Sequence, residues 1–403
     1  MTTTRTRAVR AALACALLLP VPPVAAVLEG EPYVGVELLY DDNLFRFRDE
    51  AEALATRGDD RLEDLRRQVH AGAALQYSWG LQRVIVGGEW RRISYQHASE
   101  INHDAWEAGA TADWQVARVV DGQLQLRHRR ELENFEDRDT ATLGFRRRLE
   151  MDSVTRLKVT PRWRGELTTN LERVRNSLDG SRGSDRDEYG ASLGVTYEIL
   201  RFTRMGASLK WLRGDYPERD VDPNGRVAHR YEESGLALVF ERVPSGLSTI
   251  QSELGYTRRT HPSAPALDFE GVTGRLLYRR EVSGKLVSET EVFRRINSVE
   301  EADANFRLQN GLLTRLRYRW SPKLEALASA EFHIADFDGS PALAAAAEAR
   351  EDRVGILQFG AEYRWLWWLR LSADLSWERR DSNRDERSFD DRRLAVQAEV
   401  RYD

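Results

Sequence analysis

Long runs of strict alternation between apolar and polar residues are the feature that most constrains how this chain folds. One such run covers residues 189–198 and another covers residues 369–378. A period of two residues predicts β-strands with one apolar face and one polar face. The runs exceed the roughly 5–6 residues typical of strands in soluble sheets, whereas a tilted strand that crosses lipid needs about 9–11 residues. The pattern therefore favours strands that span a membrane.

The composition excludes the other common class of membrane protein. Charged residues make up 31% of the chain and hydrophobic residues 41%, and the mean hydropathy is −0.57. A helical bundle in lipid requires spans of about 20 mostly apolar residues, and only the N-terminal segment comes near this. The single cysteine, Cys15, excludes a disulfide framework and a thiolate zinc site. A soluble globular protein and an outer-membrane β-barrel remain.

The N-terminus has the three parts of a secretory signal. Basic residues Arg5, Arg7 and Arg10 precede an apolar stretch over residues 11–19, and small residues end at Ala26. We expect residues 1–26 to be a signal peptide that is removed after export. Export combined with membrane strands indicates the outer membrane of a Gram-negative bacterium, where lipid and lipopolysaccharide would surround the protein.

Short and long connections alternate between the predicted strands. Tight turns fall at positions such as Gly80-Leu81 and Ser283-Gly284, and longer polar segments separate them. This alternation predicts an all-β fold, a transmembrane antiparallel up-and-down β-barrel of about 18 strands, within a range of roughly 16–20. The barrel would occupy residues 27–403, with long extracellular loops at residues 41–67, 171–185, 216–229 and 338–353.

Aromatic residues gather near the predicted strand ends and predict two girdles at the membrane interfaces. The residues expected on the tight-turn side are Trp79, Trp320, Trp365, Trp367, Trp368 and Tyr402, and those expected toward the long loops are Tyr95, Trp106, Trp211 and Trp377. The amphipathic last strand, with Tyr402 near its end, resembles the signal that the barrel-assembly machinery recognises. Asp403 after this aromatic residue departs slightly from the usual pattern.

The polar faces of the predicted strands carry many charges, which require water or mutual pairing. If the apolar faces meet lipid, the polar faces line a lumen that is wide at this strand number. We expect the substrate path to be lined by Arg156, Lys158, Arg162, Arg164, Arg275, Arg279, Arg315, Arg317, Arg319, Arg364 and Arg370. Two arginine ladders, at 156–164 and 315–319, lack interleaved acids, so we expect them to face open water. Arginine–glutamate ladders that only stiffen the wall are the alternative.

Other constellations give weaker signals. Asp41, Asp42 and Asn43 could bind calcium through oxygen atoms, but they lack the spacing of a known calcium loop, and an Asx turn is the favoured interpretation. We therefore predict no metal site and no cofactor. The histidines show no metal-binding spacing, and no nucleophile elbow, phosphate-binding loop or dinucleotide fingerprint is present. Nucleic acid is a poor partner for an exported acidic chain.

Several loop and turn motifs then reveal a family resemblance. The motifs are Val36-Glu-Leu-Leu-Tyr40-Asp-Asp-Asn-Leu-Phe45-Arg46, Ser184-Asp-Arg-Asp-Glu188, its near repeat Ser382-Asn-Arg-Asp-Glu386, Asp268-Phe-Glu-Gly271-Val-Thr-Gly274 and Ser283-Gly-Lys285. Together they resemble the EpsL-type outer-membrane β-barrels of exosortase-associated exopolysaccharide loci, in the β-barrel porin 2 group. The resemblance covers nearly all of the chain after residue 26, and none of its motifs is catalytic.

This resemblance implies the outer-membrane step of polysaccharide secretion. A polysaccharide chain and periplasmic and inner-membrane export components would then be partners. Because the first two motifs lie at loop–strand junctions, we expect a loop-ordering role for Asp41, Asp42, Asn43, Arg46, Asp185, Arg186 and Asp187.

Three classes of function remain. The favoured one is a passive conduit for polysaccharide export, lined by arginine and lysine. A general small-solute porin is the alternative, and a long loop folded into the lumen would favour it. The best candidate for such a loop is 41–67. Residues 51–67 could form a short helix with Leu54, Leu62 and Leu65 on one side. An outer-membrane hydrolase is a weaker alternative, because no catalytic site is recognisable, and we expect that the protein is not an enzyme.

Overall fold

The computed structural model describes residues 26–135, 141–218, 229–262, 265, 268–298, 306–338 and 349–402. The expected signal peptide therefore lies almost entirely outside the described residues. The described chain forms 18 strands with one short α-helix, α2 (Glu50–Arg57). The strands are β1 (Ala26–Asp41), β2 (Asp64–Trp79), β3 (Gln82–Tyr95), β4 (His103–Val116), β5 (Val120–Leu132), β6 (Phe145–Lys158), β7 (Trp163–Asn176), β8 (Arg186–Leu200), β9 (Thr203–Asp215), β10 (Arg230–Ser245), β11 (Ser248–Thr260), β12 (Phe269–Glu281), β13 (Leu286–Ser298), β14 (Phe306–Arg319), β15 (Leu324–Asp338), β16 (Arg350–Leu366), β17 (Leu369–Ser382) and β18 (Phe389–Arg401).

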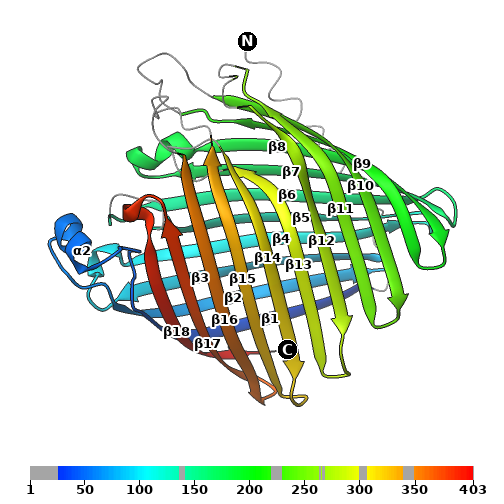
Figure 1. Cartoon of the computed structure of the whole chain (residues 1–403). Helices are drawn as coiled ribbons and strands as arrows, with labels where there is room; N and C mark the ends of the chain where they lie inside the picture. Colours follow the sequence, from blue (N-terminus) through cyan, green and yellow to red (C-terminus); the bar gives the residue numbers. More distant parts are fainter. Residues whose placement is uncertain are drawn as a thin grey trace, which may run out of the picture.

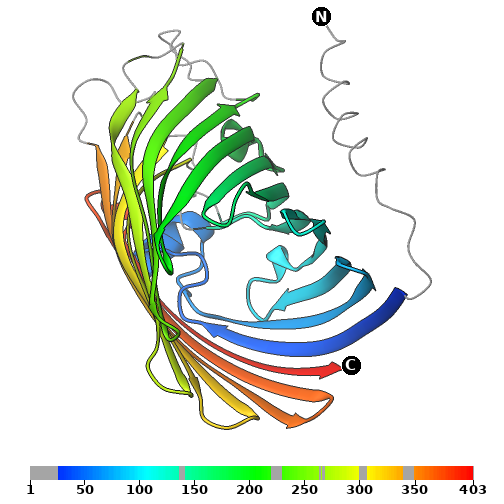
Figure 2. The ribbon, with the colours of Figure 1, turned by 90° about the vertical axis from the view of Figure 1, so that its right-hand side faces the viewer.

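The strands close into a single antiparallel barrel (Figures 1 and 2). Each strand pairs with the next along the chain, and β18 pairs with β1 from Tyr33↔Arg401 to Asp41↔Arg393. Closure leaves no unpaired sheet edge, which is the condition for a sheet to exist in lipid. The predicted fold class and strand number are confirmed. No helix in the described part of the chain has the length and apolar character needed to cross a bilayer.

Long and short connections lie at opposite ends of the barrel, which we call the loop end and the turn end. The loop end carries α2, in the connection between β1 and β2, together with the 3-10 turn before β18 (Figure 1). The turn end holds connections such as that between Trp79 and Gln82. Two predicted loop bounds were too wide, because alternation persists past them: β2 begins at Asp64, and β7 continues to Asn176. The loops predicted at 216–229 and 338–353 lie partly outside the described residues, and β16 already begins at Arg350.

The outer face of the barrel is apolar. Large hydrophobic side chains alternate along the strands with high exposure, as at Val34, Val36 and Leu38 of β1. So much exposed apolar surface is unfavourable in water, at roughly 25 cal/mol per Å², but is favourable against hydrocarbon. An even strand number is typical of bacterial single-chain membrane barrels. The protein is an outer-membrane β-barrel.

The predicted aromatic girdles contain two errors, because Trp79 and Tyr95 are both buried. Trp320, Trp365 and Trp367 are exposed at the turn end, and Trp211 is exposed toward the loop end. Tyr95, by contrast, is buried, because it shares its parity with the inward-facing Ile93 and packs beneath the loop that contains α2.

Candidate functional site in the barrel lumen

The inward faces of the strands form a charged lumen that differs between its two ends. At the turn end, inward side chains are open to water, as shown by Arg156, of which 51% is exposed, and Arg317, of which 61% is exposed. At the loop end, inward side chains such as Arg259 and Glu233 are 1% exposed. The candidate functional surface is therefore the water-exposed inner wall at the turn end. It also includes the buried inward side chains between this wall and the mouth at the loop end.

The structure places the predicted ladder at 156–164 only partly as expected. Arg156, Lys158 and Arg164 face the lumen, in register with the inward face of β7. They do not stand without acids, because Arg156 contacts Asp121 at 3.5 Å and Glu166 at 3.2 Å, and Lys158 contacts Asp121 at 3.5 Å. The expectation failed because the acids come from neighbouring strands, which alternation within one strand does not reveal.

Arg162 of the predicted set lies outside the lumen wall. It occupies the turn between β6 and β7 and donates a hydrogen bond to the Tyr197 hydroxyl at 3.3 Å. Tyr197 pairs in register with Trp163 on the outward face. Arg162 therefore belongs to the interfacial region of the turn end.

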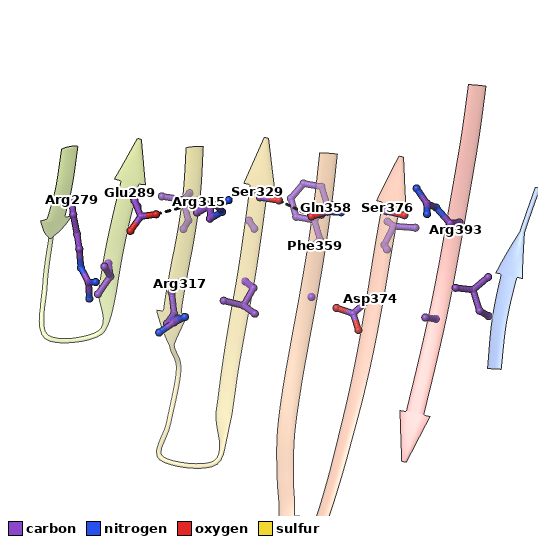
Figure 3. A pocket seen from close by; sticks show the side chains of 18 residues that line it. Arg279, Glu289, Arg315, Arg317, Ser329, Gln358, Phe359, Asp374, Ser376 and Arg393 are labelled. Carbon is purple, nitrogen blue, oxygen red and sulfur yellow. Dashed lines mark hydrogen bonds and ion pairs between the residues drawn. The ribbon is translucent and has the colours of Figure 1, made fainter. Parts of the chain in front are cut away.

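The second ladder borders a depression of about 610 Å³ in the wall formed by β12 to β18 (Figure 3). Its charged lining comprises Arg279, Arg315, Arg317, Arg393, Glu289 and Asp374, and its neutral polar lining comprises Ser329, Gln358 and Ser376. Arg315 pairs with Glu289 at 3.2 Å, and Arg317 pairs with Glu325 at 3.3 Å, so this ladder also has acidic partners. Cations still outnumber acids in the lining, which makes this basic depression suited to an anionic group.

Six of the predicted arginines have no side-chain hydrogen bond or ion pair within the described residues. They are Arg164, Arg275, Arg279, Arg319, Arg364 and Arg370. Arg364 and Arg370 stand directly opposite each other on β16 and β17. Like charges at directly opposite positions repel each other. The guanidinium donors of Arg364 and Arg370 therefore remain available to bind an anion or water.

A second depression, of about 410 Å³, lies in the wall formed by β1 to β6 and has the opposite character. Glu89, Glu107, Glu150 and Asp152 line it together with the single cation Arg127. Arg127 contacts Glu107 at 3.2 Å, and two arginines beside the lining also pair with its acids, Arg91 with Glu89 at 3.0 Å and Arg129 with Glu150 at 3.5 Å. We call this the acidic depression. The linings of the two depressions thus differ: cations outnumber acids in the first, and acids outnumber cations in the second.

The connection between β1 and β2, residues 42–63, folds into the mouth at the loop end. Phe45 and Phe47 pack with Ala53 of α2 against Tyr95, on the inward face of β3. The Phe45 ring meets the Phe135 ring edge-on at 4.7 Å between centroids. In Figure 2, α2 lies within the outline of the barrel. We call residues 42–63 the inward loop.

The helix of the inward loop differs from the expected one. It covers Glu50–Arg57 and buries Ala53, whereas Leu54 is 56% exposed and Leu65 belongs to β2. Asp49 caps it by accepting a hydrogen bond from the Glu52 amide at 2.9 Å, and Gly58 ends it in the left-handed conformation. Only Leu62 of the predicted leucines packs against the buried cluster.

Four loop-ordering predictions fall on the start of the inward loop. The Asn43 amide N–H donates to Asp41 Oδ1 at 2.9 Å, which is the Asx turn that the sequence favoured. The Asn43 side chain also donates to the Phe47 carbonyl oxygen at 2.6 Å and to the Asp390 carbonyl oxygen at 3.0 Å. Asp42 accepts from the Arg392 amide at 2.6 Å, and burial raises the pKa of the Asp42 carboxyl group.

Arg46 completes this junction. Its positive φ of 63° turns the chain, and its guanidinium lies 3.2 Å from both Asp41 and Asp391. Asp41, Asp42 and Asp391 bring carboxylate oxygens close enough together to hold a cation. The Arg46 guanidinium supplies a positive charge to two of these three carboxylates, Asp41 and Asp391.

The second predicted motif divides over three environments. Asp185 is buried and accepts from the Asn176 amide at 2.7 Å, which orders residues 177–185, and burial raises the pKa of its carboxyl group. Arg186 instead points into the lumen and contacts Glu172 at 3.1 Å. Asp187 points outward and pairs with Arg173 and Arg175. Only Asp185 of the three orders a loop through its own side chain.

Sequence reasoning did not find the buried network at the loop end. Arg259 contacts Glu233 at 2.8 Å and lies over the Tyr231 ring, and the Tyr231 hydroxyl donates to Glu188. These residues come from β8, β10 and β11 and share no local motif. Their common signal is parity alone, since each lies on the polar face of its strand.

Among solved structures, the chain is similar at low sequence identity to two bacterial proteins. The outer membrane protein OpdK of Pseudomonas aeruginosa shares 14% identity with this chain, covering 93% of it and 99% of OpdK, with a TM-score of 0.48. OccAB3 of Acinetobacter baumannii shares 10% identity over 93% and 100% of the two chains, with a TM-score of 0.47. No protein-family model and no curated protein matches the chain. At this level of similarity neither likeness carries an argument on function.

Proposed function

We propose that this protein is a passive outer-membrane channel for small hydrophilic solutes, with the basic depression as the contact point for their anionic groups. The inward loop is the observation that carries the proposal, because its Phe45, Phe47 and Ala53 pack against inward-facing residues at one mouth of the barrel. A conduit for a long polymer needs an unobstructed passage from end to end. A channel for small solutes works with a narrowed mouth.

The charges of the lumen support the same function. A solute that leaves bulk water must keep its polar groups solvated, and exposed arginines with neutral Ser329, Gln358 and Ser376 between them supply replacement partners. The different charged linings of the two depressions would also orient a dipolar solute. Contacts to exposed charges are individually weak, so a solute would not remain bound during transit.

The family resemblance is the support for polysaccharide export. No contact among the described residues favours that function. The resemblance to EpsL-type barrels therefore remains an expectation. No residue is proposed as catalytic.

Liposome swelling with solutes of graded size separates the two functions. We expect rapid entry of small carboxylates and monosaccharides and exclusion of dextran. Deleting residues 48–60 of the inward loop should raise single-channel conductance in planar bilayers and move the exclusion limit upward. Passage of dextran through the unaltered barrel, or equal conductance with and without the segment, would overturn the small-solute proposal.

Substitutions in the basic depression test its role separately. Arg279→Gln combined with Arg315→Gln should weaken block of the current by a small dicarboxylate. Glu89→Gln combined with Glu107→Gln, in the acidic depression, is the matched control and should leave that block intact or strengthen it. Equal block by the dicarboxylate in both variants would remove the depression from the proposal.

A further inference from the structure

Three arginines form a row on the outer face of the barrel at the loop end. Arg130 of β5 stands directly opposite Arg147 of β6, and Arg147 stands directly opposite Arg175 of β7. Their neighbours along each strand, Arg129, Arg148 and Val174, face the lumen, so the three guanidinium groups face outward. We call Arg130, Arg147 and Arg175 the arginine row.

The row is held in place at its two sides and is free in the middle. Arg130 donates to the Asp104 carbonyl oxygen at 2.9 Å and lies 3.6 Å from the centre of the Phe145 ring. Arg175 contacts Asp187 at 2.9 Å. Arg147 is exposed and makes no hydrogen bond or ion pair in the described structure. Directly opposed like charges destabilise a sheet by repulsion, which an anion bound over Arg147 would relieve.

The charge balance singles out this part of the outer face. Within the loop-end half of the outer face of β2 to β8, the described cations are Arg67, Arg92, Arg130, Arg147, Arg173 and Arg175, and the described acids are Asp104 and Asp187. On β9 to β18 the corresponding charges balance. Arg353 there faces Asp381 in register, and Arg379 faces Asp390. Among the described residues, the excess positive charge therefore lies on the side formed by β2 to β8.

The row lies at the edge of the apolar belt. Leu149 follows Arg147 on the outward face of β6 by one pleat, and Leu171 lies further into the belt on β7. Successive outward residues are about 6.6 Å apart along a strand, so the guanidinium groups lie at the level of lipid headgroups. The Trp106–His128 ring pair on the same face marks this interface.

We propose that the arginine row binds the phosphate groups of a phosphorylated glycolipid in the outer leaflet of the membrane. Phosphate matches the planar fork of the guanidinium group and carries the charge that the row lacks. The adjacent apolar belt accommodates acyl chains of the same molecule. The proposal uses the general rule that long loops face the cell exterior, and it is independent of what passes through the lumen.

Native mass spectrometry of the purified barrel in detergent, with added bisphosphorylated lipid A or its dephosphorylated form, tests this inference. We expect retention of the bisphosphorylated lipid only. The triple variant Arg130→Gln, Arg147→Gln, Arg175→Gln should weaken retention roughly tenfold or more, because charge-assisted hydrogen bonds are lost. The matched triple variant Arg353→Gln, Arg379→Gln, Arg392→Gln, taken from the balanced side, should retain lipid as before.

Two further variants keep the test decisive if the triple variant folds poorly. Arg147→Gln alone removes an exposed side chain without protein partners and should lower retention, whereas Arg147→Lys should preserve part of it. Single-channel conductance should be unchanged in both variants, because the row does not face the lumen. Equal retention of the two lipid forms, competition by millimolar inorganic phosphate alone, or equal loss in both triple variants would overturn the proposal.

Discussion

Replacement of Phe45 by alanine should release the inward loop from the mouth of the barrel. The Phe45 side chain is 4% exposed, its ring meets Phe135 at 4.7 Å, and the Arg57 guanidinium lies 4.2 Å from its centre. Phe→Ala substitutions in packed clusters cost about 3–5 kcal/mol. Because the cluster is small and lies near a surface, we take about 3 kcal/mol, which is roughly a 100-fold increase in the undocked population.

Thiol labelling measures this population directly. Cys15 is the only cysteine of the chain and lies in the segment that we expect to be removed. Ala53→Cys places a thiol at a position with 0% exposure, and Leu54→Cys places one beside it at a position that is 56% exposed. We expect slow maleimide labelling at position 53 and fast labelling at position 54. Phe45→Ala should accelerate labelling at position 53 by roughly the calculated factor and leave position 54 unchanged.

Leu54→Ala is the matched control, because it truncates a side chain of the same loop that makes no contribution to the buried cluster. It should leave labelling at position 53 slow. If positions 53 and 54 label at the same rate in the parent barrel, the inward loop is not docked, and the reasoning on the narrowed mouth fails with it.

Three other outcomes follow from the described contacts. The double variant Arg156→Gln, Arg164→Gln should lower the anion-to-cation permeability ratio, measured from reversal potentials. Arg162→Gln is the control and should leave this ratio unchanged. An unchanged ratio in the double variant would show that Arg156 and Arg164 do not line the solute path. Gly214→Val should lower the unfolding temperature, because its side chain would overlap the Tyr231 ring at a cost of about 1–3 kcal/mol, whereas Gly235→Val, with more space, should have a smaller effect. Burial raises the pKa of the Asp185 carboxyl group. Between the ordinary aspartate pKa and this raised pKa, the folded loop binds more protons than the unfolded chain. The stability of the folded loop should therefore fall as pH rises through this range. Amide hydrogen exchange of residues 177–184 tests this. The protection factor, which is the intrinsic exchange rate divided by the measured rate, should be larger at pH 5 than at pH 7. Asp185→Asn should abolish that difference.

The sequence predicted the architecture well because alternation reports directly on the two solvents of a membrane barrel. The same parity placed Arg315, Arg317 and Arg364 on the lumen wall. Parity could not show that Glu289 and Glu325 approach Arg315 and Arg317, since the register between strands is set by turn geometry and closure of the ring.

The remaining errors arose where strands end. Tyr95 follows the inward parity of Ile93, yet its place near a strand end suggested an interfacial girdle. The helix of the inward loop was expected to bury leucines, but the docking surface accepts the small Ala53 instead. The network around Tyr231 and Arg259 depends on strands that are distant along the chain, and no local pattern carries that information.

The junction at Asn43 and Arg46 ties the beginning of the chain to its end. Asn43 donates to the Asp390 carbonyl oxygen at 3.0 Å, and Arg46 contacts Asp391 at 3.2 Å, so both bonds depend on β18. β18 is synthesised after the other described strands, and Asn43 and Arg46 lack these contacts until β18 pairs with β1. The first residues of the inward loop are therefore fastened to the wall in the same event that closes the barrel.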